Sequence, residues 1–567
     1  MKKLLSMILV LCLCFGLIAC SVSPLVESGE STEAADTKAQ DETTAADETQ
    51  SDETTPAVDP ASEGEVELLD VEVTNNYYYT FEYSPSITAK TYQTFALSAE
   101  CAQEFGALES KLEWVNDIYK TTADDIYDSF GEVAAAAASE DEYFSYSYVT
   151  STDIVRASTN VFSASTKCEV AMPDYDVTSY LTINLNAATG EELTLSSVVT
   201  DTDKLFSFAD ARLGEIIGAD KAGSAISDYA AATGADGMLF TIGYTGISLF
   251  FGEGDLEGDA DYCGAVTIPY TDAPEIFASI CTNVPESYII PLNHGQIAFI
   301  DSDGNGLSER IALTEEESAD SDDYYIDRAV YKDEEKITFN DYSYSAEGYI
   351  VRSGGVNYLY LDQRSDNDSA IFRVVNLDDF TCDMSKIYSF GFNEESLDES
   401  FTDEESYMIY VKDAFVNPKS FKLSTSMDVL STYSGTKIYT VGEGGIPETA
   451  DELYDVLGCR IALKLKTDIT AETVDEMGNK TGEGELKAGT YITFAHTDGD
   501  KFVDFAIIDE DDIETSDYTD YQFFSLKGDA EPDTSVLYRV YEDRSDYPYT
   551  VNGIDESEIF EGIMYAG

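Results

Sequence analysis

Apolar and polar residues alternate in short runs along most of this chain after residue 66. Leu181, Ile183 and Leu185 alternate with polar neighbours, and a turn at Thr189 and Gly190 leads into the next apolar run. A period of two places the apolar side chains on one face of a strand. Because such runs recur between turn residues towards the C-terminus, the sequence predicts a protein built mainly from β-sheets.

Helical periodicity is found mainly within residues 66–285. Five apolar residues recur there at spacings of three and four, which predicts one helix: Phe105, Leu108, Leu112, Val115 and Tyr119. The run from Thr122 to Asp125 resembles a capping box and is expected to open a second helix. A third helix is expected from about Asp203. Strands and helices segregate along this region, which predicts an α+β domain.

Residues 286–445 and 446–567 are expected to form all-β modules. The first module has many hairpin signals and few helical ones, which favours a partial propeller or a β-sandwich. The second has strands separated by glycine-containing turns. Its run from Gly484 to Thr490 resembles the turn and strand of bacterial SH3-like cell-wall domains, so a small SH3-like barrel is expected there.

The N-terminus has the features of a lipoprotein signal peptide, residues 1–20. Lys2 and Lys3 precede an apolar stretch that is shorter than the roughly 20 residues needed to span a bilayer, and Ala19 precedes Cys20. In such signals the cysteine is acylated, as by palmitate, and becomes the new N-terminus. We expect Cys20 to anchor the chain to the outer face of the cytoplasmic membrane of a Gram-positive bacterium, exposed to the cell wall and exterior.

Residues 21–65 are expected to form a disordered acidic linker. Ser, Thr, Ala, Asp and Glu dominate this segment, and Lys38 is its only basic residue. Such a composition buries too little apolar surface to offset the entropy lost on ordering. The linker would hold the folded part of the chain away from the membrane.

Acidic residues outnumber basic ones by 111 to 32 in the 567 residues, a formal net charge of −79. The negative electrostatic field of such a charge disfavours nucleic acid and anionic membrane surfaces as partners. It favours cationic proteins and divalent metal ions, or it serves solubility alone. His294 and His496 are the only histidines, and there is no CxxC pair, which argues against Ser-His-Asp catalysis and zinc sites.

One loop has the spacing of a calcium site. Four oxygen-bearing side chains stand at its positions 1, 3, 5 and 9, and a main-chain carbonyl is available at position 7. These candidate ligands are Asp301, Asp303, Asn305, Leu307 and Glu309. Gly306 stands at position 6, where the chain must turn, and Ala312 at position 12 excludes an EF-hand. The sequence predicts a calcium loop on a β-hairpin, and a metal-free Asp-Gly turn is the alternative.

A second loop resembles the first more weakly. Asp498, Asp500 and Asp504 match positions 3, 5 and 9, but His496 replaces the first ligand and Lys501 replaces the turn glycine. A lysine adds positive charge where a cation would bind. A plain hairpin turn is expected here, with metal binding as the weaker alternative.

Three short segments occur in order between residues 75 and 285. They are Ile154–Ala157, Asn184–Leu195 and Gly264–Tyr270. They resemble the RsiV-like extracytoplasmic domain of lysozyme-sensing anti-sigma factors, which some secreted peptidoglycan deacetylases also carry. The resemblance implies the fold of that domain and a lysozyme-binding role, although no sigma-binding part or deacetylase motif accompanies it. Arg156, Gly264 and Pro269 are expected to shape turns and packing.

The expected function is non-enzymatic binding at the cell surface. A cationic lysozyme-like muramidase or a cell-wall component is the expected partner, and calcium would stabilise the protein. Two alternatives remain open: a carboxylate-based glycan hydrolase, and a structural or adhesion lipoprotein. A hydrolase would need a cleft that holds two carboxyl groups about 5–9 Å apart.

Overall fold

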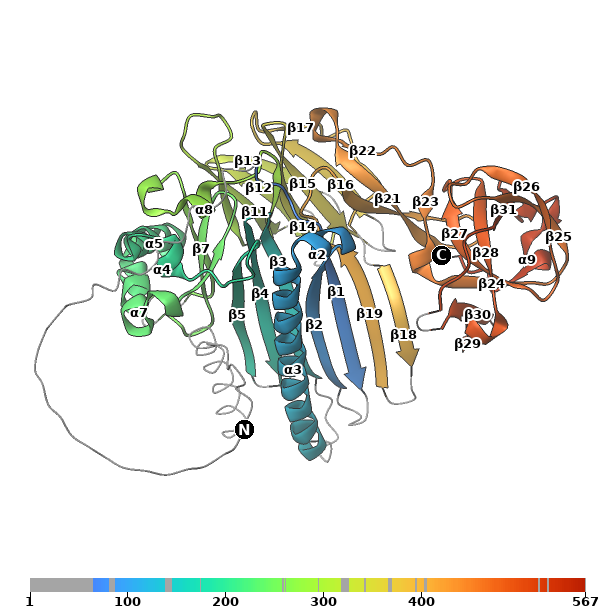
Figure 1. The fold of residues 1–567 in the computed structure, drawn as a ribbon, viewed down its shortest axis with the longest axis horizontal. Helices are drawn as coiled ribbons and strands as arrows, with labels where there is room; N and C mark the ends of the chain where they lie inside the picture. The colour runs from blue at the N-terminus through green and yellow to red at the C-terminus, as the bar shows by residue number, and fades with distance from the viewer. Residues whose placement is uncertain are drawn as a thin grey trace, which may run out of the picture. The chain divides into compact units, whose positions relative to one another are not determined.

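The fold is that of a computed structural model, drawn in Figure 1. The residues that it does not describe are 1–64, 81–86, 138–144, 174, 257–259, 261, 294, 318–325, 341–342, 366–369, 393–394, 402–404, 519–520, 528–529 and 566–567. The chain divides into two units, Met1–Gly64 and Glu65–Gly567. The expected lipidation at Cys20 and nearly all of the expected linker therefore lie outside the described residues.

A seven-stranded sheet has the order β18-β19-β1-β2-β3-β4-β5. Its strands are β1 (Val71–Thr80), β2 (Ile87–Leu97), β3 (Ser145–Ala157), β4 (Val161–Met172), β5 (Tyr175–Asn186), β18 (Glu395–Phe401) and β19 (Glu405–Asp413). Only β2 and β3 pair in parallel. Strand β19 pairs with β1 along nine residue positions, from Glu72 with Asp413 to Thr80 with Glu405. Backbone hydrogen bonds of this sheet therefore cross the boundary expected at residue 285 (Figure 1).

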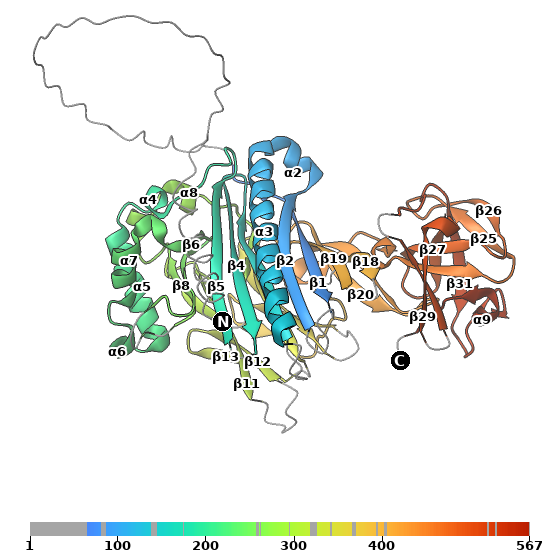
Figure 2. The ribbon, with the colours of Figure 1, turned by 90° about the horizontal axis from the view of Figure 1, so that it is seen from below.

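One long helix, α3 (Gly106–Ala137), lies along a face of the seven-stranded sheet (Figures 1 and 2). A short helix, α2 (Ala99–Glu104), precedes it. The predicted apolar stripe is buried in the core with the sheet at Leu108, Leu112, Val115 and Tyr119. The expected helix start at Thr122 is wrong, because α3 continues through this residue. The Thr122 hydroxyl donates to the carbonyl of Ile118 at 2.8 Å, a bond that a helix interior accommodates.

A helical segment and a small sheet follow β5. The helices are α4 (Leu195–Val198), α5 (Thr202–Ile217), α6 (Ala219–Ala222), α7 (Ala225–Thr233) and α8 (Ser279–Thr282), and the strands are β6 (Leu239–Ile242), β7 (Gly246–Phe251) and β8 (Gly264–Pro269). The helix expected from Asp203 is confirmed as α5. It begins where the Asp201 side chain accepts a hydrogen bond from the Lys204 amide at 3.0 Å. Apolar residues of α5 and of the small sheet form one buried cluster.

Two antiparallel sheets follow in the chain. The four-stranded sheet consists of β10 (Ile297–Ile300), β11 (Glu309–Glu317), β12 (Ile326–Lys332) and β13 (Glu335–Phe339). The five-stranded sheet consists of β9 (Tyr288–Pro291), β14 (Ser345–Ser353), β15 (Val356–Arg364), β16 (Ala370–Asn376) and β17 (Thr381–Cys382). Ile311 and Val330 of the first sheet and Leu359 and Val375 of the second share one buried cluster. The two sheets thus bury apolar faces in a common core.

The C-terminal strands form one branched sheet of fifteen strands. Its main order is β20-β21-β23-β27-β28-β31-β25-β26, which does not close on itself among the described strands. The small barrel expected for residues 446–567 is therefore wrong for the described strands, because they form an open, branched sheet. The elements are β20 (Phe421–Met427), β21 (Tyr433–Val441), β22 (Pro447–Glu448), β23 (Tyr454–Asp455), β24 (Ile461–Leu465), β25 (Ile469–Val474), β26 (Lys480–Leu486), β27 (Tyr491–Thr497), β28 (Phe502–Ile508), β29 (Ile513–Tyr518), β30 (Tyr521–Leu526), β31 (Leu537–Asp543), β32 (Thr550–Val551), β33 (Ile554–Asp555), α9 (Glu556–Ile559) and β34 (Phe560–Glu561). Since β20 and β21 precede residue 446, this sheet also crosses an expected boundary.

The described part of the chain is therefore strand-rich, with the long helices confined to its N-terminal half. An α+β region followed by β-rich segments agrees with the expected order of fold classes. What the sequence pattern does not reveal is the exchange of strands between these segments, since a period of two says which face of a strand is buried but not which strand lies beside it.

Candidate metal centre

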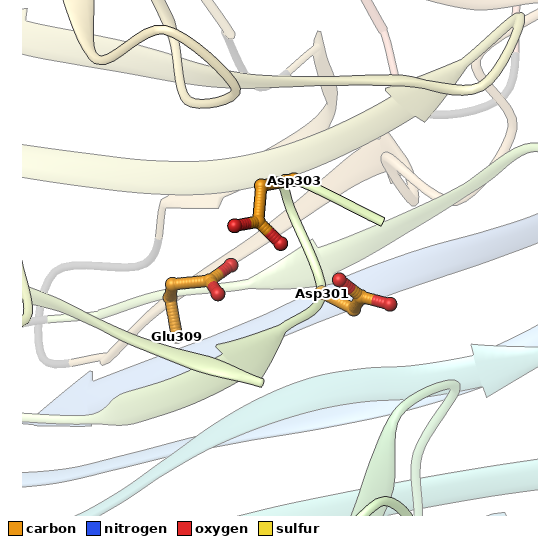
Figure 3. A group of neighbouring side chains, drawn as sticks. All are labelled: Asp301, Asp303 and Glu309. Carbon is orange, nitrogen blue, oxygen red and sulfur yellow. The ribbon is translucent and has the colours of Figure 1, made fainter. Parts of the chain in front are cut away.

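The candidate calcium loop connects β10 and β11 at the end of a hairpin. Ile300 pairs with Glu309 as the last register position of the two strands, so Asp301 leaves β10 beside the residue that begins β11. Asp303 lies between them in the loop. Figure 3 shows these three side chains coming from the end of one strand, the loop and the start of the next. The hairpin therefore brings together residues from both ends of the predicted motif.

Two glycines allow the loop to turn. Gly304 has φ 74° and Gly306 has φ 84°, a backbone region that costs little only for glycine. The Gly306 amide donates to Asp301 Oδ2 at 3.0 Å, and the Asn305 amide donates to Asp303 Oδ1 at 3.0 Å. These bonds fold the loop back on its own carboxylates.

The carboxylates of Asp301, Asp303 and Glu309 each offer an oxygen, and these oxygens all lie within 4.8 Å of one another. Oδ1 of Asp301 is buried and has no hydrogen-bond partner in the described part of the chain. No ion pair joins any of the three to a lysine or arginine that the structure describes. Neighbouring Arg310 instead lines a separate hollow with Arg212 and Phe299. Three negative charges thus converge without a described cation to balance them.

A second contact, not foreseen from the sequence, holds Glu309 in place. The amide and the hydroxyl of Ser302 both donate to Glu309 Oε2, each at 2.7 Å. Ser302 is buried, so this pair of bonds fixes the carboxylate across the base of the loop. The signal in the sequence was a hydroxyl residue between two aspartates, which is too common to single out.

The other two candidate ligands are placed differently. The Asn305 side chain is used within the turn: its Oδ1 accepts from the Leu307 amide at 2.7 Å, and its amide group donates to Asp303 Oδ2 at 2.8 Å. The Leu307 side chain is 68% exposed, so this residue has only its main-chain carbonyl to offer. Three of the five candidates therefore form the preassembled part of the site.

The chemistry of this oxygen set fits a hard divalent cation. Calcium takes about six to eight oxygen ligands in flexible geometry, with water completing sites that lack protein donors. Three carboxylates supply negative charge, and the buried Asp301 Oδ1 lacks the partner that a buried polar atom ordinarily has. A calcium ion held by Asp301, Asp303 and Glu309 would supply that partner and offset the repulsion among the carboxylates.

The second loop does not gather its acidic residues. Asp498 Oδ1 accepts from the amides of Asp500, Lys501 and Phe502 at 3.1, 2.8 and 3.1 Å, which closes a hairpin turn between β27 and β28. Asp500 is exposed and pairs with Lys501. Asp504 lies within β28 and forms an ion pair with Arg539. Asp498 and Asp500 are engaged within the turn and Asp504 by Arg539 of β31, so the three aspartates do not form a cluster of ligand oxygens.

Arg156, from the first of the three resemblance segments, is buried. Its guanidinium donates to the carbonyls of Cys281, Ile280 and Asn283 at 2.7, 3.3 and 2.7 Å, and to Asn160 Oδ1 at 3.0 Å. Burial lowers the pKa of this guanidinium, which nonetheless remains charged at neutral pH. Arg156 therefore ties β3 to the segment around α8, in agreement with the expected packing role.

In the described part of the chain, no helix combines the length and the apolar character needed to cross a bilayer.

No family model matches the sequence, and no curated protein matches it. Part of the chain matches two solved structures of the DUF3298 family. One, from Bacteroides fragilis, is 14% identical, with 38% of this chain and 93% of that chain covered and a TM-score of 0.26. The other, from Pseudomonas aeruginosa, is 9% identical, with 38% and 95% covered and a TM-score of 0.24.

Proposed function

We propose that this chain is a lipid-anchored surface protein that binds calcium at the β10–β11 hairpin and presents its sheets for binding a partner outside the membrane. The observation that carries the calcium proposal is the convergence of Asp301, Asp303 and Glu309 within 4.8 Å. The buried, unpartnered Asp301 Oδ1 adds a place for one direct ligand bond. Calcium binding would join the two ends of the hairpin.

The affinity expected for the site is modest. Extracellular calcium modules bind with dissociation constants on the order of 10⁻⁴–10⁻³ M, and only three carboxylates are preassembled here. A ligand at 100 times its dissociation constant stabilises the folded state by about 2.7 kcal/mol. At about 10 mM, calcium is roughly 10–100 times the expected dissociation constant and would stabilise the folded state by about 1.4–2.7 kcal/mol, so the melting temperature is expected to rise measurably.

The test is thermal unfolding of the purified protein with and without calcium chloride. Calcium should raise the melting temperature of the wild type, and EDTA should reverse the rise. Asp301→Asn should abolish the rise, whereas Asp500→Asn in the other hairpin should keep it. No calcium-dependent shift in the wild-type protein, or an equal shift in Asp301→Asn, would refute the proposal.

The partner that we propose is a cationic muramidase of the lysozyme type. The support is the resemblance of residues 75–285 to the lysozyme-sensing domain together with the net charge of −79. Opposite charge speeds encounter more than it fixes affinity, so specificity must come from a shaped surface. The test is retention of lysozyme on the immobilised protein at physiological salt. Cytochrome c, a cationic protein of unrelated fold, is the control. Equal retention of both proteins, or of neither, would refute specific recognition.

The alternative of a carboxylate-based glycan hydrolase has less support. One pair of neighbouring carboxyl groups, Glu542 and Glu556, is buried with only 6% of each residue exposed. The hydroxyl of Tyr565 lies 3.0 Å from an oxygen of each. A glycosidase needs room between its carboxyl groups for the sugar and, in inverting enzymes, for water. A tyrosine hydroxyl that bonds to both carboxyl groups suits a structural role better.

A further inference from the structure

Three side chains from separate elements meet near the end of the chain. Glu542 lies in β31, Glu556 begins α9, and Tyr565 lies beyond β34. The Tyr565 oxygen is 3.0 Å from Glu542 Oε1 and 3.0 Å from Glu556 Oε2. Both glutamates are buried. The arrangement places one hydroxyl between two carboxyl groups inside the fold.

The number of protons shared by Tyr565, Glu542 and Glu556 follows from the hydrogen bonds that they make. A phenol has one proton, so Tyr565 can donate to only one of the two carboxyl groups. If both were ionised, the second contact would set a lone pair against a lone pair in a buried place. If one is a carboxylic acid, it donates to the Tyr565 oxygen while the tyrosine donates to the other, and both contacts become hydrogen bonds. The geometry therefore requires one proton more than two carboxylates and a phenol supply.

The hydrogen bonds around the group indicate which glutamate carries that proton. Glu542 Oε2 also accepts from the main-chain amide of Leu430 at 3.0 Å, and an amide donor favours the charged form of a carboxyl group. Glu556 has no main-chain donor of this kind among the described contacts. Burial, followed by the neighbouring Glu542, raises the pKa of Glu556 to about 8. Glu556 is therefore the carboxylic acid that holds the extra proton.

The charged groups nearby agree with this assignment. Arg544, just after β31, is the basic residue that interacts with Glu542, while its guanidinium donates to the main-chain carbonyl of Asp428 and lies 4.7 Å from the ring centre of Tyr549. Asp555, at the start of α9, adds negative charge beside Glu556. Tyr433 is a further titratable group beside Glu542. Burial raises its pKa, so it is neutral in the physiological range. The positive charge of Arg544 therefore acts on Glu542, whereas the charged groups beside Glu556 are the acidic residues Glu542 and Asp555.

The same segment is tied to the start of the C-terminal sheet. The carbonyl of Met564 accepts from the Thr432 amide and from the Ser431 hydroxyl, each at 2.7 Å. The Met564 amide donates to the Ser431 hydroxyl at 3.2 Å. Tyr565 therefore follows directly on a residue that holds the chain end against the β20–β21 connection.

We propose that Glu542, Tyr565 and Glu556 form a proton-sharing clasp that fastens the C-terminal segment to β31 and α9, and that loss of the shared proton at alkaline pH loosens it. Below the pKa of folded Glu556, both contacts to Tyr565 are hydrogen bonds. Above it, two buried carboxylates compete for one phenolic proton. Because the pKa of Glu556 is higher in the folded than in the unfolded chain, the folded state holds the extra proton between the usual carboxyl range and about pH 8, and stability falls as pH rises through that window.

The test is thermal unfolding of the full-length protein from pH 5.5 to 9.5. The melting temperature of the wild type should fall from pH 5.5 to about pH 8, and the contribution of Glu556 to this fall should level off above that pH. Glu556→Gln keeps the shape, donates an amide proton to Tyr565 and cannot ionise, so it should remove this fall. Glu558→Gln, an exposed neighbour in α9, should keep it. A wild-type pH profile that coincides with that of Glu556→Gln would overturn the proposal.

A second measurement separates the clasp from general alkaline destabilisation. Amide hydrogen exchange of the peptide that contains Met564 is compared between wild type and Glu556→Gln at equal pH, so that the chemical exchange rate cancels. The two should exchange alike at pH 6, and the wild type should exchange several-fold faster at pH 9. Equal exchange at both pH values would show that the proton does not hold this segment.

Discussion

Asp504 and Arg539 form a two-point ion pair across neighbouring strands of the C-terminal sheet. Nε and Nη2 of Arg539 each donate to a different oxygen of Asp504 at 2.7 Å. The two residues face each other in the register of β28 and β31, and the Asp504 side chain has no exposed surface. Asp504, the last acidic residue of the second candidate loop, therefore forms an ion pair inside the sheet and is not a metal ligand there.

Removing the Asp504 charge should destabilise the protein without affecting calcium. Asp504→Asn leaves Arg539 as a largely buried cation without its partner, and such a loss costs about 3 kcal/mol or more. Urea unfolding followed by circular dichroism measures this change. Asp500→Asn, on an exposed residue of the same hairpin, should change the free energy of unfolding by less than about 0.5 kcal/mol. Equal stability of the two variants would contradict the structural role.

Ser302 should tune calcium affinity although it need not touch the ion. Ser302→Ala removes the hydroxyl that positions Glu309 while keeping the main-chain bond, and loss of such a supporting contact typically weakens metal binding about 10-fold or more. A calcium titration of the melting temperature measures the effect. Ser308→Ala is the matched control, since the Ser308 hydroxyl bonds to Thr271 at 2.9 Å instead. A stronger effect of the Ser308 variant would place the site elsewhere.

Arg156 should be needed for folding stability and not for partner binding. Arg156→Met leaves the buried carbonyl of Cys281 without its donor, and such an unsatisfied buried group costs about 1–3 kcal/mol. The carbonyls of Ile280 and Asn283 still accept from the Asn160 side-chain amide at 3.4 and 2.9 Å. The free energy of unfolding should fall by about 1–3 kcal/mol, whereas Arg310→Met on a half-exposed residue should have little effect. Unchanged stability with lost lysozyme retention would instead make Arg156 a recognition residue.

Cys20 should determine where the protein is found. Cys20→Ala removes the acylated residue, and the variant should lose incorporation of labelled palmitate and be released into the medium. Cys14→Ala lies within the expected signal peptide and should keep both the label and the membrane association. A Cys20→Ala protein that remains labelled and membrane-bound would contradict the lipid anchor.

The sequence allowed the local structure of the hairpin to be predicted well. Asp301, Asp303 and Glu309 come together because two register-paired strands set the ends of the loop and two glycines let it turn, and all of this is encoded within a few residues. Asn305 and Leu307 met the same spacing rule, but turn hydrogen bonds use the Asn305 side chain. Spacing alone does not distinguish an oxygen that ligates from one that closes a turn.

Long-range relationships could not be predicted in the same way. The pairing of β1 with β19 joins residues that are far apart in the chain, and alternation of apolar residues carries no information on such partners. The shared proton of Glu542 and Glu556 likewise depends on three elements folding onto one another. In a chain with 111 acidic residues, nothing local marks these two glutamates as a pair.

The most direct test of the central claim is the stoichiometry of calcium binding, measured by isothermal titration calorimetry at physiological salt on the wild type and Asp301→Asn. The account predicts that the wild type binds one calcium ion more per chain than the variant, with a dissociation constant on the order of 10⁻⁴–10⁻³ M. Identical binding by the two proteins would mean that the acidic surface alone attracts calcium, and would contradict a metal centre formed by Asp301, Asp303 and Glu309.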